Sequence, residues 1–156
     1  SGMGKAGQIA MNIATTFCST GIPSVFLHPS EAQHGDLGIL QKNDLLLLIS
    51  NSGKTREIVE LTELAARLKS GIEKRLSLRE IRIVRWRKQL IFVWLQDTPM
   101  KVCLLGMTPT TSTTVMTVIG DILVVETMRK TGFTIEEYSK RHHGGYLGER
   151  SRALSK

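Results

Sequence analysis

The sequence has few cysteines and no long hydrophobic run, and both shortages narrow the class of protein. With only Cys18 and Cys103 in 156 residues, a disulfide framework is not expected. No apolar run reaches the about 20 residues that a membrane-spanning helix needs, and no secretory signal peptide opens the chain. These absences predict a cytoplasmic domain without a membrane partner, in which both thiols are buried as apolar side chains.

Length and composition favour a single globular domain. A chain of 156 residues with 41% hydrophobic and 22% charged residues is typical of a folded soluble domain. We find neither an internal repeat nor a low-complexity linker, so we expect one domain over residues 1–150 and a short tail over 151–156. The chain begins on a loop, SGMGKAG, which predicts that this domain is truncated at its N-terminus.

The formal charge of +7 would normally suggest a nucleic-acid partner, but the charge is unevenly distributed. Residues 73–101 hold eight Lys or Arg, three Asp or Glu and both tryptophans, so this segment has a net charge of +5 and the rest only +2. One interpretation of the segment is an RNA- or membrane-binding insertion. Because the basicity is confined to one segment, we expect no nucleic-acid partner for the domain as a whole.

Hydrophobic periodicity in the first half of the chain predicts an α/β fold. Apolar residues recur at helical spacing over 7–20, and a short strand is expected at 24–27. The run DLLLLI at 44–49 is typical of a strand that is covered on both faces of a parallel sheet. An amphipathic helix follows over 55–69, and strand, polar turn and helix together make half of a βαβ unit.

The second half of the chain is expected to be mainly helical. PTTSTT leads into a long apolar helix that ends near Lys130. Thr134 and Glu137 form a capping-box pattern for a further helix that ends at Arg141. The remaining sequence is rich in glycine and polar residues, and the periodicity predicts no helix there.

Two glycine motifs resemble nucleotide-binding loops only superficially. GMGKAG fits G-x-G-x-x-G, but no strand precedes it and the predicted strand after it ends on His28 rather than on an acidic residue. GKT at 53–55 resembles the end of a Walker A loop, yet Leu48 stands where that loop needs a glycine. The sequence therefore favours neither a dinucleotide cofactor nor a nucleoside triphosphatase.

The turn SNSGKT has a simpler interpretation. The hydroxyls of Ser50, Ser52 and Thr55, with the free N–H groups of a helix start, can hold a phosphate group that belongs to no nucleotide. The alternative is that Ser52 or Thr55 only caps the helix. The spacing leaves both interpretations open, and PTTSTT invites the same two.

The four histidines of the chain are candidate site residues. His28 and His34 lie after a predicted strand, and His142 and His143 precede a double glycine. A histidine in a loop is most often solvated, but active sites of α/β proteins form beside strand ends.

Five blocks taken together resemble one family. GMGKAGQIA, STGIPSVFLHPSEAQHGDLG, SNSGKTREI, CLLGMTPTTSTT and RHHGGYLG occur in the order and near-spacing of the arabinose-5-phosphate isomerases, a branch of the SIS (sugar isomerase) domain family. The resemblance covers residues 1–72 and 102 to about 150. It implies a flavodoxin-like, three-layer αβα sandwich around a parallel sheet, here without its first strand and without the CBS domains that many members append.

The resemblance also implies a function. Members of this branch interconvert D-ribulose 5-phosphate and D-arabinose 5-phosphate, on the way to the Kdo sugar of lipopolysaccharide or capsule in Gram-negative bacteria. No cofactor is required, and the family usually builds its sites between the protomers of a homotetramer. A phosphosugar-binding SIS module without catalysis is the alternative.

Residue roles follow where the motifs match. Lys5, Glu57 and His142 match positions held to be catalytic in the family. Aldose–ketose exchange through an enediol needs a base that moves a proton between C1 and C2, and a cation or acid that stabilises the oxygens, and these three side chains supply such groups. Lys101 stands where the family has a further glutamate, which places catalysis by this exact chain in question.

Other matching positions concern binding. Gly21, Ile22 and His34 match sugar-contacting positions. His28 matches a histidine that is implicated in binding a zinc ion that inhibits the enzyme rather than catalysing the reaction. His143 departs from the family, which usually has proline at this place.

Residues 73–101 do not resemble the family, and their codons suggest a reason. Leu78–Arg85, back-translated with permitted codons and read from the last base of the Leu78 codon, gives TGNPDSP, the turn that the family has here. Residues 98–101, read one base early, give HPDE, whose glutamate lies behind Lys101. We hypothesise two compensating frameshifts, the first soon after Ile72 and the second just before Val102. The shifted runs IRIVRW and QLIFVWL are β-prone and can still form strands.

Overall fold

The computed structural model describes residues 1–41, 44–68, 84–86, 90–93 and 100–155. The chain forms two compact units. The first unit contains residues 1–11 and 26–117, and the second contains residues 12–25 and 118–156. Helices α1 (Lys5–Ser19) and α3 (Thr111–Thr131) each contribute residues to both units.

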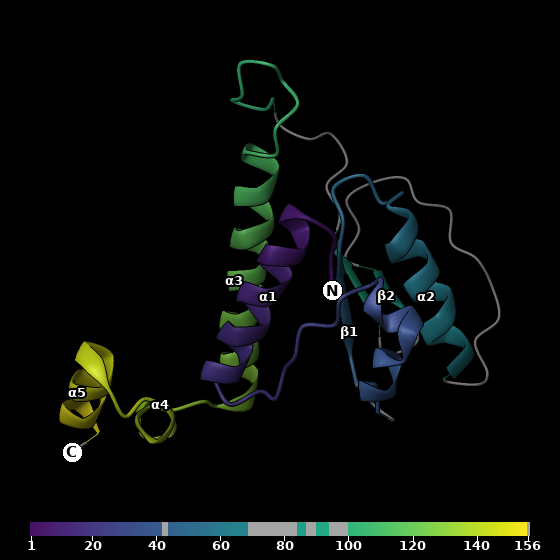
Figure 1. The fold of residues 1–156 in the computed structure, drawn as a ribbon. Helices are drawn as coiled ribbons and strands as arrows, with labels where there is room; N and C mark the ends of the chain where they lie inside the picture. The colour runs from purple at the N-terminus through teal and green to yellow at the C-terminus, as the bar shows by residue number, and fades with distance from the viewer. Residues whose placement is uncertain (42–43, 69–83, 87–89, 94–99, 156) are drawn as a thin grey trace. The chain divides into compact units, whose positions relative to one another are not determined.

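A small sheet lies in the first unit (Figure 1). Strands β1 (Leu46–Ile49), β2 (Val84–Trp86) and β3 (Leu90–Val93) are arranged in the order β1-β3-β2. β1 and β3 are parallel, whereas β2 is antiparallel to β3. The parallel pair agrees with the fold that the resemblance implies, and the described residues 84–86 and 90–93 of the β-prone runs form strands.

The first residues of the chain continue this sheet beside β1. Gly2 forms a parallel bridge with Ile49, and the Ile49 N–H donates to the carbonyl oxygen of Ser1 at 2.9 Å. The predicted strand at 24–27 is wrong, because these residues adopt no β pairing. Leu27 packs into the core through its side chain, while Ser1–Gly2 and β3 are the backbone neighbours of β1.

The core of the first unit lies between β1 and α2 (Arg56–Leu68). Leu48 and Ile58 are almost completely buried, and burying a side chain of this kind stabilises a fold by about 1.5–3 kcal/mol. Two short 3-10 helices, η1 (Glu31–His34) and η2 (Asp36–Ile39), precede β1. The buried cluster consists of Leu27, Ala32, Leu46, Leu48, Ile58, Leu61 and Ala65.

The described part of the second unit is mainly helical. Ile13 on α1 and Val124 on α3 are buried. The short helix α4 (Ile135–Arg141) begins as predicted, since the Thr134 hydroxyl accepts a hydrogen bond from the Glu137 N–H at 3.3 Å. A last helix, α5 (Gly145–Leu154), occupies the sequence for which no helix was predicted. It packs through the small residues Gly148 and Ser151, which a search for apolar periodicity does not detect.

The prediction that both thiols are buried is wrong. Cys18 is exposed and Cys103 is partly exposed, and both are free thiols. Cys18 follows Phe17 directly and therefore lies outside the stripe of apolar residues that α1 buries. Its sulfur donates a hydrogen bond to the carbonyl oxygen of Ser24 at 3.0 Å.

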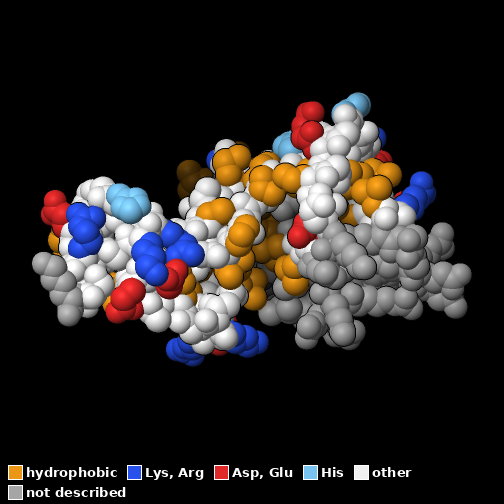
Figure 2. Space-filling view, turned by 90° about the horizontal axis from the view of Figure 1, so that it is seen from below, with side chains coloured by type: hydrophobic (Ala, Val, Ile, Leu, Met, Phe, Trp, Pro, Cys, Tyr) orange, Lys and Arg blue, Asp and Glu red, His pale blue; other side chains and the backbone are white. Residues whose placement is uncertain are grey.

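Large apolar side chains are exposed in several places, and Figure 2 shows hydrophobic side chains reaching the surface on one face. By length and composition α3 is apolar enough to cross a membrane, although it contains Asp121 and Glu126, and it is the one such helix in the part of the chain that the structure describes. The most exposed apolar residues of the first unit lie in one loop and are Met100, Val102, Leu104, Leu105 and Met107. Contiguous apolar surface of this kind is typical of protein–protein contacts.

Candidate functional site

Lys5 is held at the start of α1 by two glycines that touch each other. A Cβ atom on Gly7 would lie 2.6 Å from the carbonyl oxygen of Gly2, and a Cβ atom on Gly2 would lie 2.7 Å from the carbonyl oxygen of Ala6. Both distances are shorter than any contact that a real Cβ atom makes with backbone. The glycines of GMGKAG are therefore required where the first residues of the sheet turn into α1. Lys5 is the first residue of this helix, and it is exposed.

The hydroxyls of the SNSGKT turn hold the link between β1 and α2 in shape. The buried Ser50 Oγ accepts the Gly53 N–H at 3.1 Å and lies 3.1 Å from the Thr55 Oγ1. The Ser52 Oγ accepts the Lys54 N–H, also at 3.1 Å. By contrast, Asn51 Oδ1 is buried and has no hydrogen-bond partner among the described residues. This amide was not singled out from the sequence, because its burial depends on the tertiary fold.

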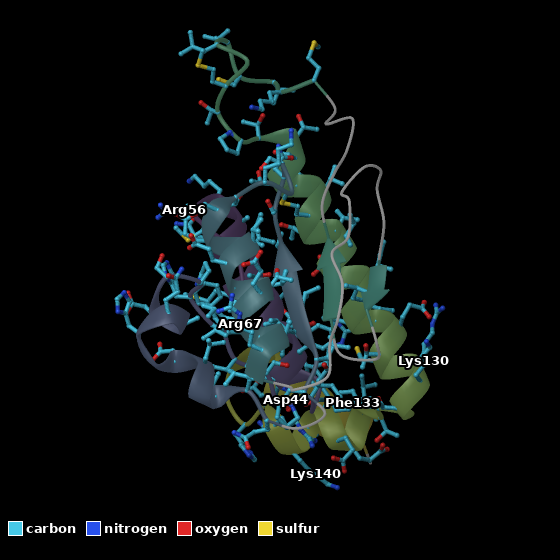
Figure 3. All side chains as sticks on the ribbon, turned by 90° about the vertical axis from the view of Figure 1, so that its right-hand side faces the viewer. Asp44, Arg56, Arg67, Lys130, Phe133 and Lys140 are labelled. Carbon is cyan, nitrogen blue, oxygen red and sulfur yellow. The ribbon has the colours of Figure 1, made fainter. Side chains whose placement is uncertain are left out.

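Glu57 lies in the first turn of α2 and is half-buried. A carboxylate in the first turn of a helix is stabilised by the free N–H groups there. Figure 3 shows Arg56 and Arg67 on the same helix. Arg56 forms an ion pair with Glu60 at 3.5 Å, and the other oxygen of Glu60 accepts the Gln33 side-chain N–H at 2.8 Å.

Gln33, which contacts Glu60 of α2, immediately precedes His34. His34 ends η1 and is exposed. Its imidazole can therefore meet a ligand from solvent, and the residue before it contacts the helix that carries Glu57.

His28 has an unpaired buried nitrogen. Its ring packs edge-on against Phe26, with the ring centroids 6.1 Å apart, and its Nδ1 atom has no hydrogen-bond partner among the described residues. A zinc site needs at least three protein ligands, and no group of three His, Cys, Asp or Glu side chains is close enough in the described ranges. Zinc binding at His28 thus remains a prediction, and no catalytic step is assigned to the metal.

Lys101 lies in the exposed loop that leads to α3. Its ammonium group donates to the carbonyl oxygen of Met107 at 2.9 Å. The Thr111 hydroxyl donates to the carbonyl oxygen of Met100 at 3.0 Å and so connects this loop to the start of α3. Thr110 Oγ1, within PTTSTT, is buried and unpaired among the described residues, like the Asn51 oxygen.

The same loop contains an activated thiol. Hydrogen bonds from the Thr108 side chain and from backbone N–H groups lower the pKa of Cys103 from 9.0 to about 6. A thiolate rather than a thiol is therefore the main form of Cys103 at neutral pH.

We expect iodoacetamide to alkylate Cys103 at a rate that rises with pH through a midpoint near 6, the pKa given above. The rate is measured in a Cys18→Ser background, so that only one thiol is present. Thr108→Val removes the hydroxyl hydrogen bond and should move the midpoint toward the ordinary thiol value of 9.0. Identical midpoints for the two proteins would contradict the role of Thr108.

Gly21 and Ile22 lie where α1 ends, in the second unit. The Gly21 N–H donates to the carbonyl oxygen of Cys18 at 3.1 Å, and the Ile22 N–H donates to that of Phe17 at 3.0 Å. A Cβ atom on Gly21 would lie 3.2 Å from the guanidinium group of Arg141. The structure thus brings a predicted sugar-contacting residue against the residue that precedes His142.

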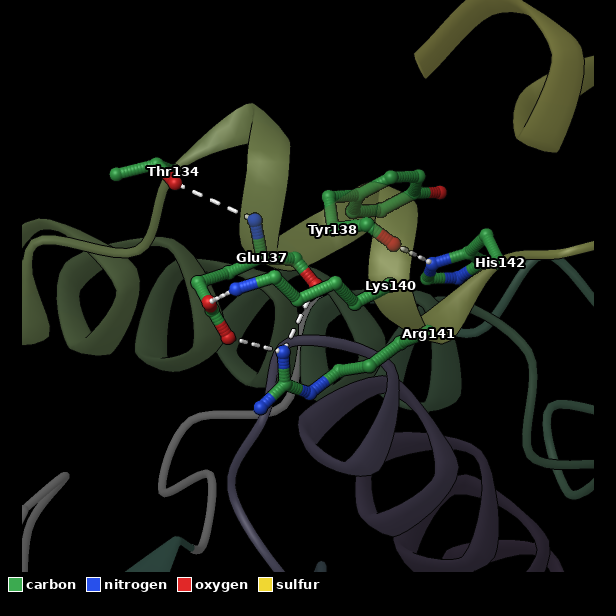
Figure 4. A network of polar contacts seen from close by, with 6 residues as sticks. All are labelled: Thr134, Glu137, Tyr138, Lys140, Arg141 and His142. Carbon is green, nitrogen blue, oxygen red and sulfur yellow. Dashed lines mark hydrogen bonds and ion pairs between the residues drawn. The ribbon is translucent and has the colours of Figure 1, made fainter. Parts of the chain in front are cut away.

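A network of charges stabilises the last turn of α4 (Figure 4). The Glu137 carboxylate accepts hydrogen bonds from Lys140 and, at 2.7 Å, from Arg141. These two bonds lower the pKa of Glu137 from 4.5 to about 2. Arg141 also donates to the Glu137 carbonyl oxygen at 2.8 Å and lies over the Phe133 ring, 5.6 Å from its centroid. The Arg141 guanidinium group therefore has its partners, Glu137 and Phe133, within the second unit.

His142 follows α4 directly and is half-buried. Its ring stacks on Tyr138 with the centroids 3.7 Å apart and the planes 7° from parallel. Its Nδ1 atom lies 2.9 Å from the Tyr138 carbonyl oxygen. Sequence reasoning missed Tyr138, although its place four residues before His142 on a predicted helix was a usable signal.

The predicted site residues fall into both units. Gly21, Ile22 and His142 belong to the second unit, where the contact between Gly21 and Arg141 brings two of the motifs together. The residues of the first unit are Lys5, His28, His34, Ser50, Ser52, Thr55, Glu57 and Lys101.

Known proteins resemble this chain over most of its length. The arabinose 5-phosphate isomerase of Yersinia pestis is 42% identical over 149 residues, which are 96% of this chain and 44% of that protein. The arabinose 5-phosphate isomerase of Pseudomonas aeruginosa is 40% identical over the same length. The chain thus spans less than half the length of the curated relatives that it matches.

Solved structures also resemble this chain over most of its length. A Bacteroides fragilis protein described as a phosphosugar isomerase involved in capsule formation is 68% identical, with a TM-score of 0.77, over 93% of this chain and 75% of that one. An E. coli protein in complex with arabinose 5-phosphate is 33% identical, with a TM-score of 0.69, over 90% and 73% of the two chains. The family model for the SIS domain matches residues 1–72. The chain therefore belongs to the SIS domain family and, within it, to the branch of the arabinose 5-phosphate isomerases.

Proposed function

We propose that this protein interconverts D-ribulose 5-phosphate and D-arabinose 5-phosphate. The observation that carries the proposal is the similarity to a protein solved with arabinose 5-phosphate bound, which extends over 90% of this chain. The curated relatives, at about 40% identity, are named for the same reaction. We place the product on the route to the Kdo sugar of lipopolysaccharide or capsule in the cytoplasm of a Gram-negative bacterium.

The reaction moves one carbon-bound proton, and the predicted residues offer the groups for this. A base removes a proton from C1 of ribulose 5-phosphate while the C2 oxygen gains a proton, which gives an enediol. Return of a proton to C2 and loss of the proton on the C1 oxygen then give the aldehyde of arabinose 5-phosphate. We assign the carbon-bound proton to Glu57, stabilisation of the oxygens to Lys5, and proton transfer at the oxygens to His142.

We propose that the polar turns bind the phosphosugar. Ser50, Ser52 and Thr55 fix the SNSGKT turn at the start of α2, where backbone N–H groups favour an anion. Asn51 Oδ1, which has no partner among the described residues, supports a ligand here, because a buried amide oxygen without a partner is costly. Gly21, Ile22 and His34 are proposed to contact the sugar.

We also propose the complete αβα sandwich and a homotetramer for the whole protein. The parallel pair β1 and β3, with α2 packed on β1, supports the sandwich. The exposed apolar loop that contains Leu104 and Leu105 supports association, because water-exposed apolar area of this extent is usually covered in an assembly.

One observation favours the second candidate function, a phosphosugar-binding module without catalysis. Lys101 replaces an acidic group by a cation at a family position, and here the ammonium group is bound to a backbone carbonyl. A cation at this place can still attract a phosphosugar, but it cannot accept a proton from carbon. Binding would then persist without turnover.

The frameshift hypothesis concerns residues 73–101, most of which lie outside the described residues. The match of the family model ends at residue 72, immediately before the segment in question. Resequencing of the source DNA tests the hypothesis. Relatives that carry LREIRIVRW in their own sequence would contradict it.

The test of the function is an isomerase assay with ribulose 5-phosphate, combined with calorimetric titration of arabinose 5-phosphate. Three proteins are compared: this chain, its Lys101→Glu variant, and a version in which residues 73–101 are restored to the alternative reading frame. We expect turnover in the restored version and little or none in this chain. Binding without turnover in all three supports the second candidate, and full activity of this chain would contradict the role given to the lost glutamate.

A further inference from the structure

His142 is held at the end of α4 by one residue through two different contacts. The Tyr138 ring lies face to face with the imidazole, with 3.7 Å between the centroids. The Tyr138 carbonyl oxygen lies 2.9 Å from Nδ1. The two residues are four positions apart, so the last turn of the helix presents both contacts to the same ring.

The carbonyl contact selects one tautomer of the imidazole. A carbonyl oxygen only accepts hydrogen bonds, so Nδ1 must carry the proton that lies between the two atoms. In the neutral ring the lone pair is then on Nε2. Nε2 takes no part in the contact with the Tyr138 carbonyl oxygen, and it is the nitrogen that can exchange a proton with a ligand.

Tyr138 has further contacts within its own segment. Its N–H donates to the Thr134 carbonyl oxygen at 3.0 Å, and its ring meets Phe133 edge to face, with 6.4 Å between centroids. Glu137 and Arg141 bridge the same turn of the helix. The Tyr138 ring thus contacts Phe133 at an edge and His142 on a face, on a helical turn that an ion pair bridges.

The backbone of His142 is fixed from α5 as well. A Cβ atom on Gly148 would lie 2.5 Å from the His142 carbonyl oxygen, so α5 packs directly on the backbone of His142. Arg152 on the same helix donates to the His143 carbonyl oxygen at 3.0 Å. With its main chain held by α5 and its ring held by Tyr138, His142 has little freedom left.

We infer that Tyr138 is the positioning residue of His142: its ring fixes the plane of the imidazole and its carbonyl oxygen holds the proton on Nδ1, which leaves Nε2 as the nitrogen that meets the phosphosugar. The inference rests on the proposed function, because the part of His142 in proton transfer belongs to that proposal. The tautomer and the ring orientation are properties of the folded chain alone, and they can be measured without turnover.

The first arm of the test is an NMR spectrum of the ring nitrogens of ¹⁵N-histidine-labelled protein at alkaline pH, where imidazoles are neutral. The His142 signals are assigned by their loss in His142→Gln. We expect the Nδ1–H tautomer in the unchanged protein and in Tyr138→Phe, which keeps the ring and the carbonyl. Tyr138→Leu keeps the carbonyl but removes the stacked ring, so the imidazole can turn away from the carbonyl oxygen and should give a mixture of tautomers. An Nε2–H tautomer in the unchanged protein overturns the inference, whether or not any variant folds.

The second arm is kinetic and uses the version that turns over ribulose 5-phosphate. We expect Tyr138→Leu to lower kcat about 10–100-fold with little change in KM, as for other residues that orient a reacting group, and Tyr138→Phe to be close to its parent. Equal kcat values for Tyr138→Leu and its parent overturn the inference. Failure of the isomerase activity itself, with the Nδ1–H tautomer present, would contradict the proposed function and leave the positioning by Tyr138 intact.

Discussion

Replacing Glu57 by glutamine is expected to lower kcat of the isomerisation about 100- to 10,000-fold, with a much smaller change in KM. The amide has nearly the size of the carboxylate and can still form hydrogen bonds, but it cannot accept a proton from C1. The substitution removes one favourable charge from the first turn of α2, worth about 0.3–1 kcal/mol, so this helix of 13 residues should still form in the variant. The measurement is the rate of arabinose 5-phosphate formation by the frame-restored version.

Glu63→Gln is the matched control for this substitution. Glu63 is on the same helix as Glu57 and is exposed, so the change removes the same charge from the same element. We expect its kcat to equal that of the parent. If both variants lose activity alike, the effect is one of charge or stability, and Glu57 is not the base.

Gly7→Ala is expected to lower the free energy of unfolding by about 1–3 kcal/mol, as overpacking does in other proteins. The added methyl group would meet the carbonyl oxygen of Gly2 at 2.6 Å, and backbone cannot rotate away as a side chain can. Either the bridge between Gly2 and Ile49 or the start of α1 must move. Both changes displace Lys5, so turnover should fall together with stability.

Urea denaturation followed by circular dichroism measures this effect, and Gly38→Ala is its control. A Cβ atom on Gly38 has no neighbour within 4 Å, so that substitution should leave the midpoint of unfolding unchanged or raise it slightly. An unchanged midpoint in Gly7→Ala would mean that the contact between Gly2 and Gly7 is looser than the structure shows.

The helices were largely predictable because their determinants are local. The apolar stripe of α2 and the Thr134 cap of α4 each follow from residues that are neighbours in sequence. The strand predicted at 24–27 is wrong because β pairing depends on a partner, and β1 has its neighbours elsewhere in the chain. α5 was missed because it packs through Gly148, where the absence of a side chain is what allows contact.

The sequence predicted which residues belong to the candidate site, but not which residues hold them in place. The resemblance supplied Lys5, Glu57 and His142, while the residues that hold them in place depend on tertiary packing. That Asn51 Oδ1 is buried without a partner among the described residues could not be read from SNSGKT. Tyr138 lies between these cases, because a spacing of four residues on a helix is visible in the sequence, whereas the stacking geometry is not.

The contact between Gly2 and Gly7 also affects how glycine motifs are used to assign function. Two glycines of a G-x-G-x-x-G pattern are required here by the approach of backbone to backbone. A motif search that counts only glycines will therefore wrongly assign a dinucleotide-binding site to chains of this kind. Whether an acidic residue ends the strand that follows the helix separates the two origins of the same pattern.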